Sequence, residues 1–274
     1  MIQADQHLSA EQYTEAADAL HTLSGMLLLE FARHNETAAT RDLIVRNFIA
    51  RADTMVRGIF RLWEIKDYGD CWIIHRTLLD RLFHLHALNV HDQFDAFDDW
   101  SFKMQYEAAN LLRSDPELKG QVRELVDDLT TEQKMRYQRH APNWRRPKAE
   151  DVAGAMDLSF LYKYGFDFAS QHVHPMANDG QEDFFNITHL EPKPNFPNPT
   201  MVLSNSILAA SLISQEALNA STLSWRRVVY DAVDGIRDFL RCASPEHLLP
   251  LVKVSKMFEE HISLAQRRES DTSQ

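Results

Sequence analysis

The stretch from Ile73 to His91, IIHRTLLDRLFHLHALNVH, constrains the fold more than any other part of the chain. Apolar residues recur on nearly every side of the helix that it predicts, and such a helix is normally buried inside a domain. One narrow line is polar, because Arg76, Asp80 and His84 follow at intervals of four residues and share a face. Buried charges are rare unless they are paired or used. The stretch therefore predicts a central helix with an internal polar site.

The rest of the chain indicates an all-α protein. Only 8 of the 274 residues are glycine, and no run of alternating β-branched residues indicates a strand. We expect a single helical domain over residues 1–274, built as a multi-helix bundle around the buried central helix. Its polar motifs lie within about 38–182, and C-terminal helices at 201–268 pack on that core. Phe184–Thr200 contains four prolines and predicts an irregular loop.

Capping signals and apolar spacing place the remaining helices. Ser9 and Gln12 form a capping box at the start of the first one. The expected helices lie at about 9–34, 37–65, 92–112, 116–140, 150–156, 158–174 and 201–221, with a further one up to Ala243 and a last one from Ser244.

Charge and cysteine content exclude several classes of protein. A formal net charge of −11 and a pI near 5.6 are not those of a general nucleic-acid binder. Cys71 and Cys242 form no metal or redox motif. The first residues show no signal-peptide pattern, and the apolar runs look too short and interrupted to span a membrane. We therefore expect a cytoplasmic protein with no membrane segment.

A second informative stretch is Tyr162–Met176, YKYGFDFASQHVHPM. As a helix it places Ser170, Gln171 and His174 on one side, with Tyr164 within reach of a shared pocket. The proline that follows His174 stops the helix, so this imidazole is expected at a helix end.

These two stretches carry a resemblance. An Arg-x-x-x-acid pair on a buried helix, a later Trp and a Tyr-x5-Ser-x3-His-Pro pattern resemble a bacterial all-helical domain family of unknown function. The family usually has Glu at the position of Asp80, so this carboxylate reaches less far. The resemblance implies a helical bundle in which the motif residues converge, and it implies no biochemical role. The matching residues, within roughly 45–180, are Arg76, Asp80, Trp144, Tyr164, Ser170 and His174-Pro175.

We interpret the polar residues as a site for an anionic ligand. Arg76 would bind an anion or a phosphate, and Asp80 would orient Arg76 or a histidine. His174 would act as acid or base beside Ser170, and Tyr164 would donate a hydrogen bond. Further ligand contacts are assigned to His84, Gln171 and Trp144, and no cofactor or metal is assigned. The same charges could instead form a structural ion pair that fixes how the helices meet.

Two enzymatic alternatives remain open. Arg81 and His86 have the Arg-x4–6-His spacing that is the hallmark of HEPN-type ribonucleases, which would indicate a metal-independent ribonuclease of a bacterial defence or toxin system. The segment Arg136–Lys148 mixes cations with aromatic residues, as a single-stranded RNA track does. A metal-dependent hydrolase could use Asp80 and His84 as ligands, although the adjacent arginine opposes a cation and no Glu-x-x-His motif is present. The partners that remain open are RNA, an anionic small molecule and a second copy forming a homodimer.

Overall fold

The computed structural model describes residues 8–33, 39–115, 117, 130–139, 144–174, 176–177, 180–190, 200–221, 226–249 and 251. Within these ranges the regular structure is helical and no strand is present, which confirms the all-α multi-helix prediction. The elements are α1 (Ala10–Arg33), α2 (Thr40–Glu64), α3 (Tyr68–His91), α4 (Phe94–Ser114), α6 (Thr131–Arg139), α7 (Ala149–Ala155), α8 (Ser159–Leu161), the π-helix η2 (Tyr162–Asp167), α9 (Phe168–Val173), α10 (Gln181–Thr188), α11 (Thr200–Ala220), α12 (Arg226–Cys242) and the 3₁₀-helix η3 (Pro245–His247).

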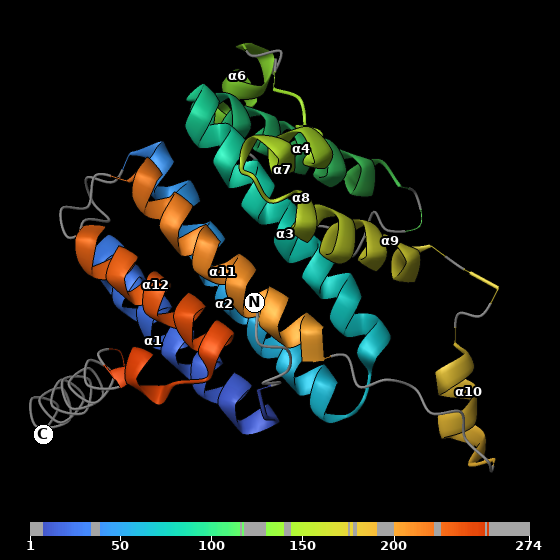
Figure 1. Ribbon diagram of the computed structural model, residues 1–274. Helices are drawn as coiled ribbons and strands as arrows, with labels where there is room; N and C mark the ends of the chain where they lie inside the picture. The colour runs from blue at the N-terminus through green and yellow to red at the C-terminus, as the bar shows by residue number, and fades with distance from the viewer. Residues whose placement is uncertain are drawn as a thin grey trace, which may run out of the picture.

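Three helices, α2, α3 and α11, pack against one another at the centre of the bundle. On one side, α1 contacts α2 and α11, and α12 contacts α11 and α1. On the other side, α7, η2 and α9 lie along α3 (Figure 1). Because α3 is covered from both sides, its sequence must be apolar almost all the way round, as observed.

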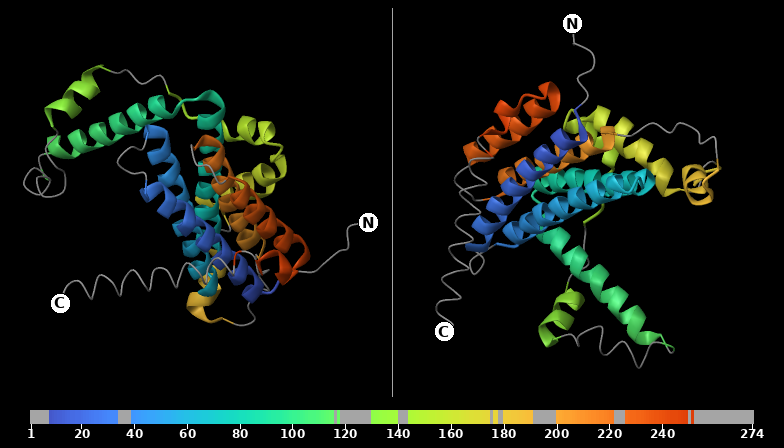
Figure 2. Two further views of the ribbon diagram at one scale, coloured as in Figure 1. Left: turned by 90° about the vertical axis from the view of Figure 1, so that its left-hand side faces the viewer. Right: turned by 90° about the horizontal axis from the view of Figure 1, so that it is seen from below.

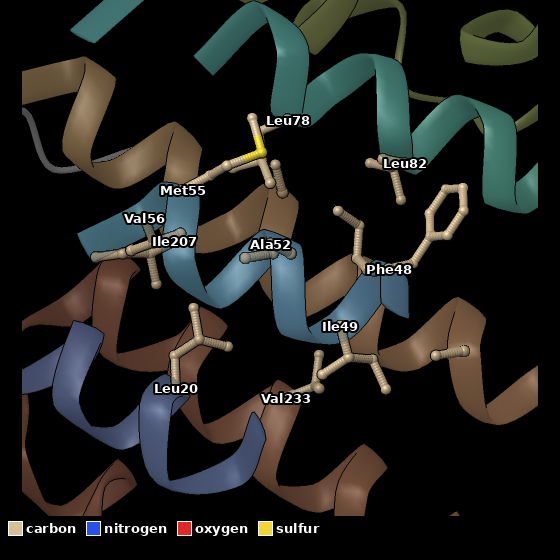
Figure 3. Close-up of a cluster of buried hydrophobic side chains, with 14 of the residues drawn as sticks. Leu20, Phe48, Ile49, Ala52, Met55, Val56, Leu78, Leu82, Ile207 and Val233 are labelled. Atoms are coloured by element: carbon tan, nitrogen blue, oxygen red, sulfur yellow. The ribbon is translucent and has the colours of Figure 1, made fainter. Parts of the chain in front are cut away.

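Figure 3 shows where these helices share one hydrophobic core. Side chains from five helices meet there, and burying such apolar surface is the main favourable term in folding. On α2 the buried residues recur every three or four positions, which turns one continuous stripe toward its neighbours. The core side chains that meet are Leu20 of α1, Phe48, Ile49, Ala52, Met55 and Val56 of α2, Leu78 and Leu82 of α3, Ile207 of α11 and Val233 of α12.

The ends of the helices follow local capping rules. The capping box predicted at the start of α1 is present, since the backbone N–H of Ser9 donates to Gln12 Oε1 and that of Gln12 donates to Ser9 Oγ. The central helix begins at Tyr68, five residues earlier than expected, because the Asp67 side chain accepts from the backbone N–H of Asp70. It ends at His91 and is followed by the C-cap Asp92, whose left-handed backbone has φ 48°.

The small and apolar residues of α11 form a core helix, as predicted. Its buried serines donate to carbonyls one turn earlier, as Ser211 does to Ile207 and Ser214 to Ala210, so they leave no hydroxyl unsatisfied. Contrary to the sequence expectation, this one helix of the described chain is long and apolar enough to cross a membrane by length and composition. However, 78% of its apolar window is buried inside the bundle, which accounts for its composition.

One other expectation needs correction. Phe184–Thr188 belongs to α10 and is not irregular, because all four prolines of the predicted loop come after Leu190 and none of them interrupts this turn. The proline-rich part itself, 191–199, lies outside the described residues. After Ser244 the chain forms the 3₁₀-helix η3, and Leu249 and Leu251 are helical. The rest of the last expected helix lies outside the described residues, as do most residues of the helix expected at 116–140.

Helix α4 extends away from the bundle, and α6 lies beside it (Figure 2). Arg136 of α6 holds the two together, since its guanidinium donates to Asp98 and Asp99 of α4 at 2.5 and 2.6 Å. The rings of Tyr106 and Tyr137 pack at 4.1 Å between centroids. The cation of Arg136 is thereby neutralised within the arm that these two helices form.

Candidate functional site

Arg76 links the central helix to the segment that covers it. Its Nε donates to Ser170 Oγ at 2.9 Å, and the Ser170 hydroxyl donates to the carbonyl of Phe166 at 2.8 Å. The guanidinium carbon also lies 4.5 Å from the centroid of the Phe166 ring, in a cation–π contact. The plane of the guanidinium group is therefore fixed by α9 and η2.

Asp80 lies between two arginines. Its Oδ2 is 3.7 Å from Arg76 Nη1 and accepts from Arg146 Nη2 at 3.2 Å. The Nε of Arg146 donates to His84 Nε2 at 3.1 Å. The polar line of Arg76, Asp80 and His84 that the spacing predicts on α3 is thus present. Arg146, from the segment before α7, contacts both Asp80 and His84.

His84 is neutral at pH 7. Its pKa is lowered to about 4, mainly by burial and also by the charges of Arg146 and Arg81, while Asp80 acts in the opposite sense. Since Nε2 accepts from Arg146, the imidazole carries its proton on Nδ1. The ring also packs edge-on against Trp144, with 5.8 Å between centroids.

Trp144 is buried and anchors the segment that carries Arg146. Its indole packs against Phe97 and Trp100 of α4 as well as against His84, with centroids at 5.0, 4.6 and 5.8 Å. At 5% exposure the ring has almost no free face to stack on a ligand. Its placement therefore suits packing, although sequence reasoning assigned it to ligand contact.

The other motif residues lie at the surface. Tyr164 is exposed and packs against Phe160, with the Lys163 ammonium over its ring. His174 is the exposed C-cap of α9, and its backbone N–H donates to the carbonyl of Ser170. Gln171 is exposed as well. The contacts that join the two motifs are thus those of Arg76 and Ser170, and the catalytic roles given to Tyr164 and His174 stay predictions.

The site opens to solvent, whereas sequence reasoning placed it inside the bundle. The side chains of Arg76, Asp80 and Arg146 are 27%, 15% and 65% exposed. The reason is that α7, η2 and α9 cover one side of α3 and leave Thr77, next to Arg76, exposed. The polar line therefore marks the edge between a covered and an open side of the helix.

The residues of the two enzymatic alternatives are placed as follows. Arg81 lies over the Phe48 ring of α2, 5.9 Å from its centroid, whereas His86 Nδ1 lies 3.2 Å from Glu216 Oε2 of α11. The two members of the Arg-x4-His pair thus face different helices. In the part of the chain that the structure describes, no group of three His, Cys, Asp or Glu side chains is close enough to hold a metal ion. Asp80 and His84 are both engaged by Arg146.

Sequence reasoning missed two residues. Arg146 was noted only as one of several cations in a basic segment, since spacing on a helix carries no information about a loop residue. His75 is completely buried, and its Nδ1 lies 2.9 Å from Ser206 Oγ of α11. Its Nε2 faces Gly165, where a Cβ would come within 3.0 Å. The sequence signal that could have identified His75 was its place next to Arg76 on a helix predicted to be buried.

Comparisons with known proteins identify a family and nothing more specific. No curated protein matches the chain, and no solved structure matches it. The model of a family described as "Family of unknown function (DUF5677)" matches residues 42–189, more than half of the chain. This span includes α3, the Arg146 segment and α9, and the match agrees with the resemblance noted from the motifs. The chain therefore belongs to this family of unknown function.

Proposed function

We propose that the protein binds an anionic small molecule at the open edge of α3, through Arg76 and Arg146. The observation that carries this proposal is that two guanidinium groups share a single carboxylate, that of Asp80. His84 is neutral, so one positive charge remains uncompensated at the site. In a chain with a net charge of −11, this local excess runs against the overall sign.

The geometry suits a phosphate or a carboxylate. A guanidinium group carries five N–H donors in a planar fork, and the contacts within the protein engage only part of each fork. Arg76 is held flat by Phe166 and oriented by Ser170, while Arg146 is held by His84 and Asp80 and is 65% exposed. Preorganised donors of this kind bind anions with little loss of side-chain entropy.

Anion binding is testable by calorimetric titration with inorganic phosphate at low ionic strength. Arg146→Ala removes one of the two cations, and Ser170→Ala removes the acceptor that orients Arg76. We expect about tenfold weaker binding for Arg146→Ala and a smaller loss for Ser170→Ala. Arg145→Ala is the matched control, because it removes an exposed neighbouring cation outside these contacts. Equal loss in Arg145→Ala and Arg146→Ala would contradict a built site.

A catalytic role requires more than binding. His174 is one helical turn beyond Ser170, the residue that holds Arg76, so it is the first side chain to test as acid or base. Purified protein is incubated with an RNA oligonucleotide, with and without EDTA, beside His174→Ala. Cleavage that survives EDTA and is lost in the variant would support the ribonuclease alternative, and cleavage lost in EDTA would support the metal-dependent one. If the RNA stays intact in every reaction while the protein binds phosphate, the result supports anion binding without catalysis.

A further inference from the structure

A second pair of cations is formed by Arg51 of α2 and Arg81 of α3. Arg81 lies over the ring of Phe48, and Arg51 follows Phe48 by three residues on the same side of α2. The Nε of Arg81 is buried and has no hydrogen-bond partner among the described residues. Neither arginine forms an ion pair with a carboxylate in that part of the chain. Burial and the charge of Arg51 lower the pKa of the Arg81 guanidinium, and Asp80 raises it. Two neighbouring cations that are not paired with a carboxylate oppose folding unless they bind an anion.

Both cation pairs adjoin the same histidine. Arg146 binds His84 directly, and the charge of Arg81 also acts on that ring. On α3, Arg76 and Arg81 are five residues apart, which is about 140° of rotation and about 7.5 Å along the axis. The exposed Thr77 lies between them. The two pairs therefore border one continuous strip of surface on either side of Asp80 and His84.

Each arginine of α3 is also supported by an aromatic ring. Phe166 lies under Arg76 and Phe48 under Arg81, at 4.5 and 5.9 Å from the guanidinium carbons. A ring face holds a guanidinium group in place without using its N–H donors. Four guanidinium groups and one carboxylate leave an excess of three positive charges over the two pairs. One phosphate would compensate only part of that excess.

We propose that the ligand is a small molecule with linked phosphoryl groups, such as a di- or triphosphate, which bridges the Arg76–Arg146 pair and the Arg51–Arg81 pair. This inference rests on the proposed function and specifies its ligand class. A compact oligophosphate fits better than RNA, because the aromatic Trp144 is buried and Arg136 is neutralised by two aspartates. The rest of this acidic chain also repels a long polyanion.

The test compares inorganic phosphate, pyrophosphate and tripolyphosphate by calorimetric titration of the full chain. We expect the wild-type protein to bind tripolyphosphate at least about tenfold more tightly than phosphate. Arg51→Ala, which changes an exposed residue, should remove most of that preference and weaken phosphate binding far less than tripolyphosphate binding. Arg61→Ala is the matched control, because it removes an exposed cation from the same helix ten residues away.

Each outcome separates the inference from the proposed function. Equal affinity for phosphate and tripolyphosphate, or equal behaviour of Arg51→Ala and Arg61→Ala, overturns the bridging ligand and leaves the anion site standing. Absence of binding by all three anions overturns both. Tighter binding of a single-stranded RNA oligonucleotide than of tripolyphosphate, with the same dependence on Arg51, overturns the assignment to a small molecule.

Discussion

Two histidines of α3, His75 and His84, differ in their surroundings although both are neutral. The pKa of His75 is lowered to about 3 by burial alone. That of His84 is lowered to about 4 by burial and by neighbouring arginines. His75 meets Ser206, Trp72 and Gly165, and none of these groups is charged. His84, nine residues later, meets Arg146, Asp80 and Trp144 at the open edge.

The comparison teaches that a shifted pKa has two meanings in one helix. Around His75 the shift reports a sealed core, in which the ring fills space and pairs with a serine. Around His84 burial again lowers the pKa most, but the charges of Arg146 and Arg81 also lower it, and an anion can offset those charges. Only the second environment can respond to a ligand, because its charged groups reach solvent.

Replacement of each histidine by alanine should separate the two environments most strongly. His75→Ala leaves a cavity at the contact of α3, α11 and η2 and removes the partner of Ser206, so we expect it to lower the free energy of unfolding by about 3–5 kcal/mol. His84→Ala, at a more open position, should lower it by about 1 kcal/mol. Urea denaturation followed by circular dichroism measures both. Similar losses in the two variants would show that the two rings contribute equally to the free energy of unfolding and would contradict the comparison.

Acid should destabilise the protein through both rings. An unfolded histidine takes up a proton near pH 6.5, whereas His75 stays neutral down to about pH 3 and His84 to about pH 4. Between these values the unfolded state binds more protons, so the free energy of unfolding falls as the pH falls, by up to about 1.4 kcal/mol per pH unit for each ring. Denaturation curves at half-unit steps from pH 7 to pH 4 measure this slope.

The slope also has an internal control. His84→Ala should reduce it by the contribution of one ring and leave that of His75. A variant with the wild-type slope would mean that His84 titrates alike in the folded and unfolded chain, which contradicts the neutral acceptor inferred for Arg146.

Close packing on the sealed side can be tested at a glycine. A Cβ at Gly165 would lie 2.9 Å from Leu79 Cδ1 and 3.0 Å from His75 Nε2. We expect Gly165→Ala to destabilise the protein by about 1–3 kcal/mol, because the neighbours must shift. Gly154→Ala on α7 is the matched control, since nothing lies within 4 Å of its Cβ, and it should be neutral or slightly stabilising. Thermal denaturation measures both variants, and equal melting temperatures would contradict close packing at Gly165.

The smallest effect on stability is expected at the open edge. Asp80→Asn keeps the shape of the side chain and removes the one negative charge between Arg76 and Arg146. We expect a loss of about 1 kcal/mol or less in the free energy of unfolding, because the pair is partly exposed. Phosphate binding should become several-fold tighter, since the competing carboxylate is gone. Weaker binding in this variant would mean that Asp80 itself contacts the ligand.

Helical spacing was sufficient to predict much of the fold and part of the site. The four-residue interval of Arg76, Asp80 and His84 follows from the helix period alone, as does the start of α1 at its capping box. The position of Ser170 beside Arg76 came from the motif and not from spacing, because two separate helices must meet there.

The rest depended on tertiary packing. Arg146 reaches Asp80 because the buried Trp144 anchors its segment against α4, which no local pattern encodes. The burial of His75 depends on α11, more than 100 residues further along the chain. The openness of the site depends on how far the short helices α7 and α9 extend over α3, and sequence fixes their composition but not this coverage.

The number of residues in the π-helix η2 determines how Ser170 is oriented toward Arg76. Its backbone bonds span five residues instead of four, so η2 accommodates one residue more than an α-helix of the same height between Leu161 and Phe168. Each α-helical residue turns the chain by about 100°. A single deletion inside η2 would therefore turn Ser170 by about that angle away from Arg76, even if every remaining side chain were unchanged. Segment length, as much as residue identity, decides whether Arg76 keeps its hydrogen-bond partner.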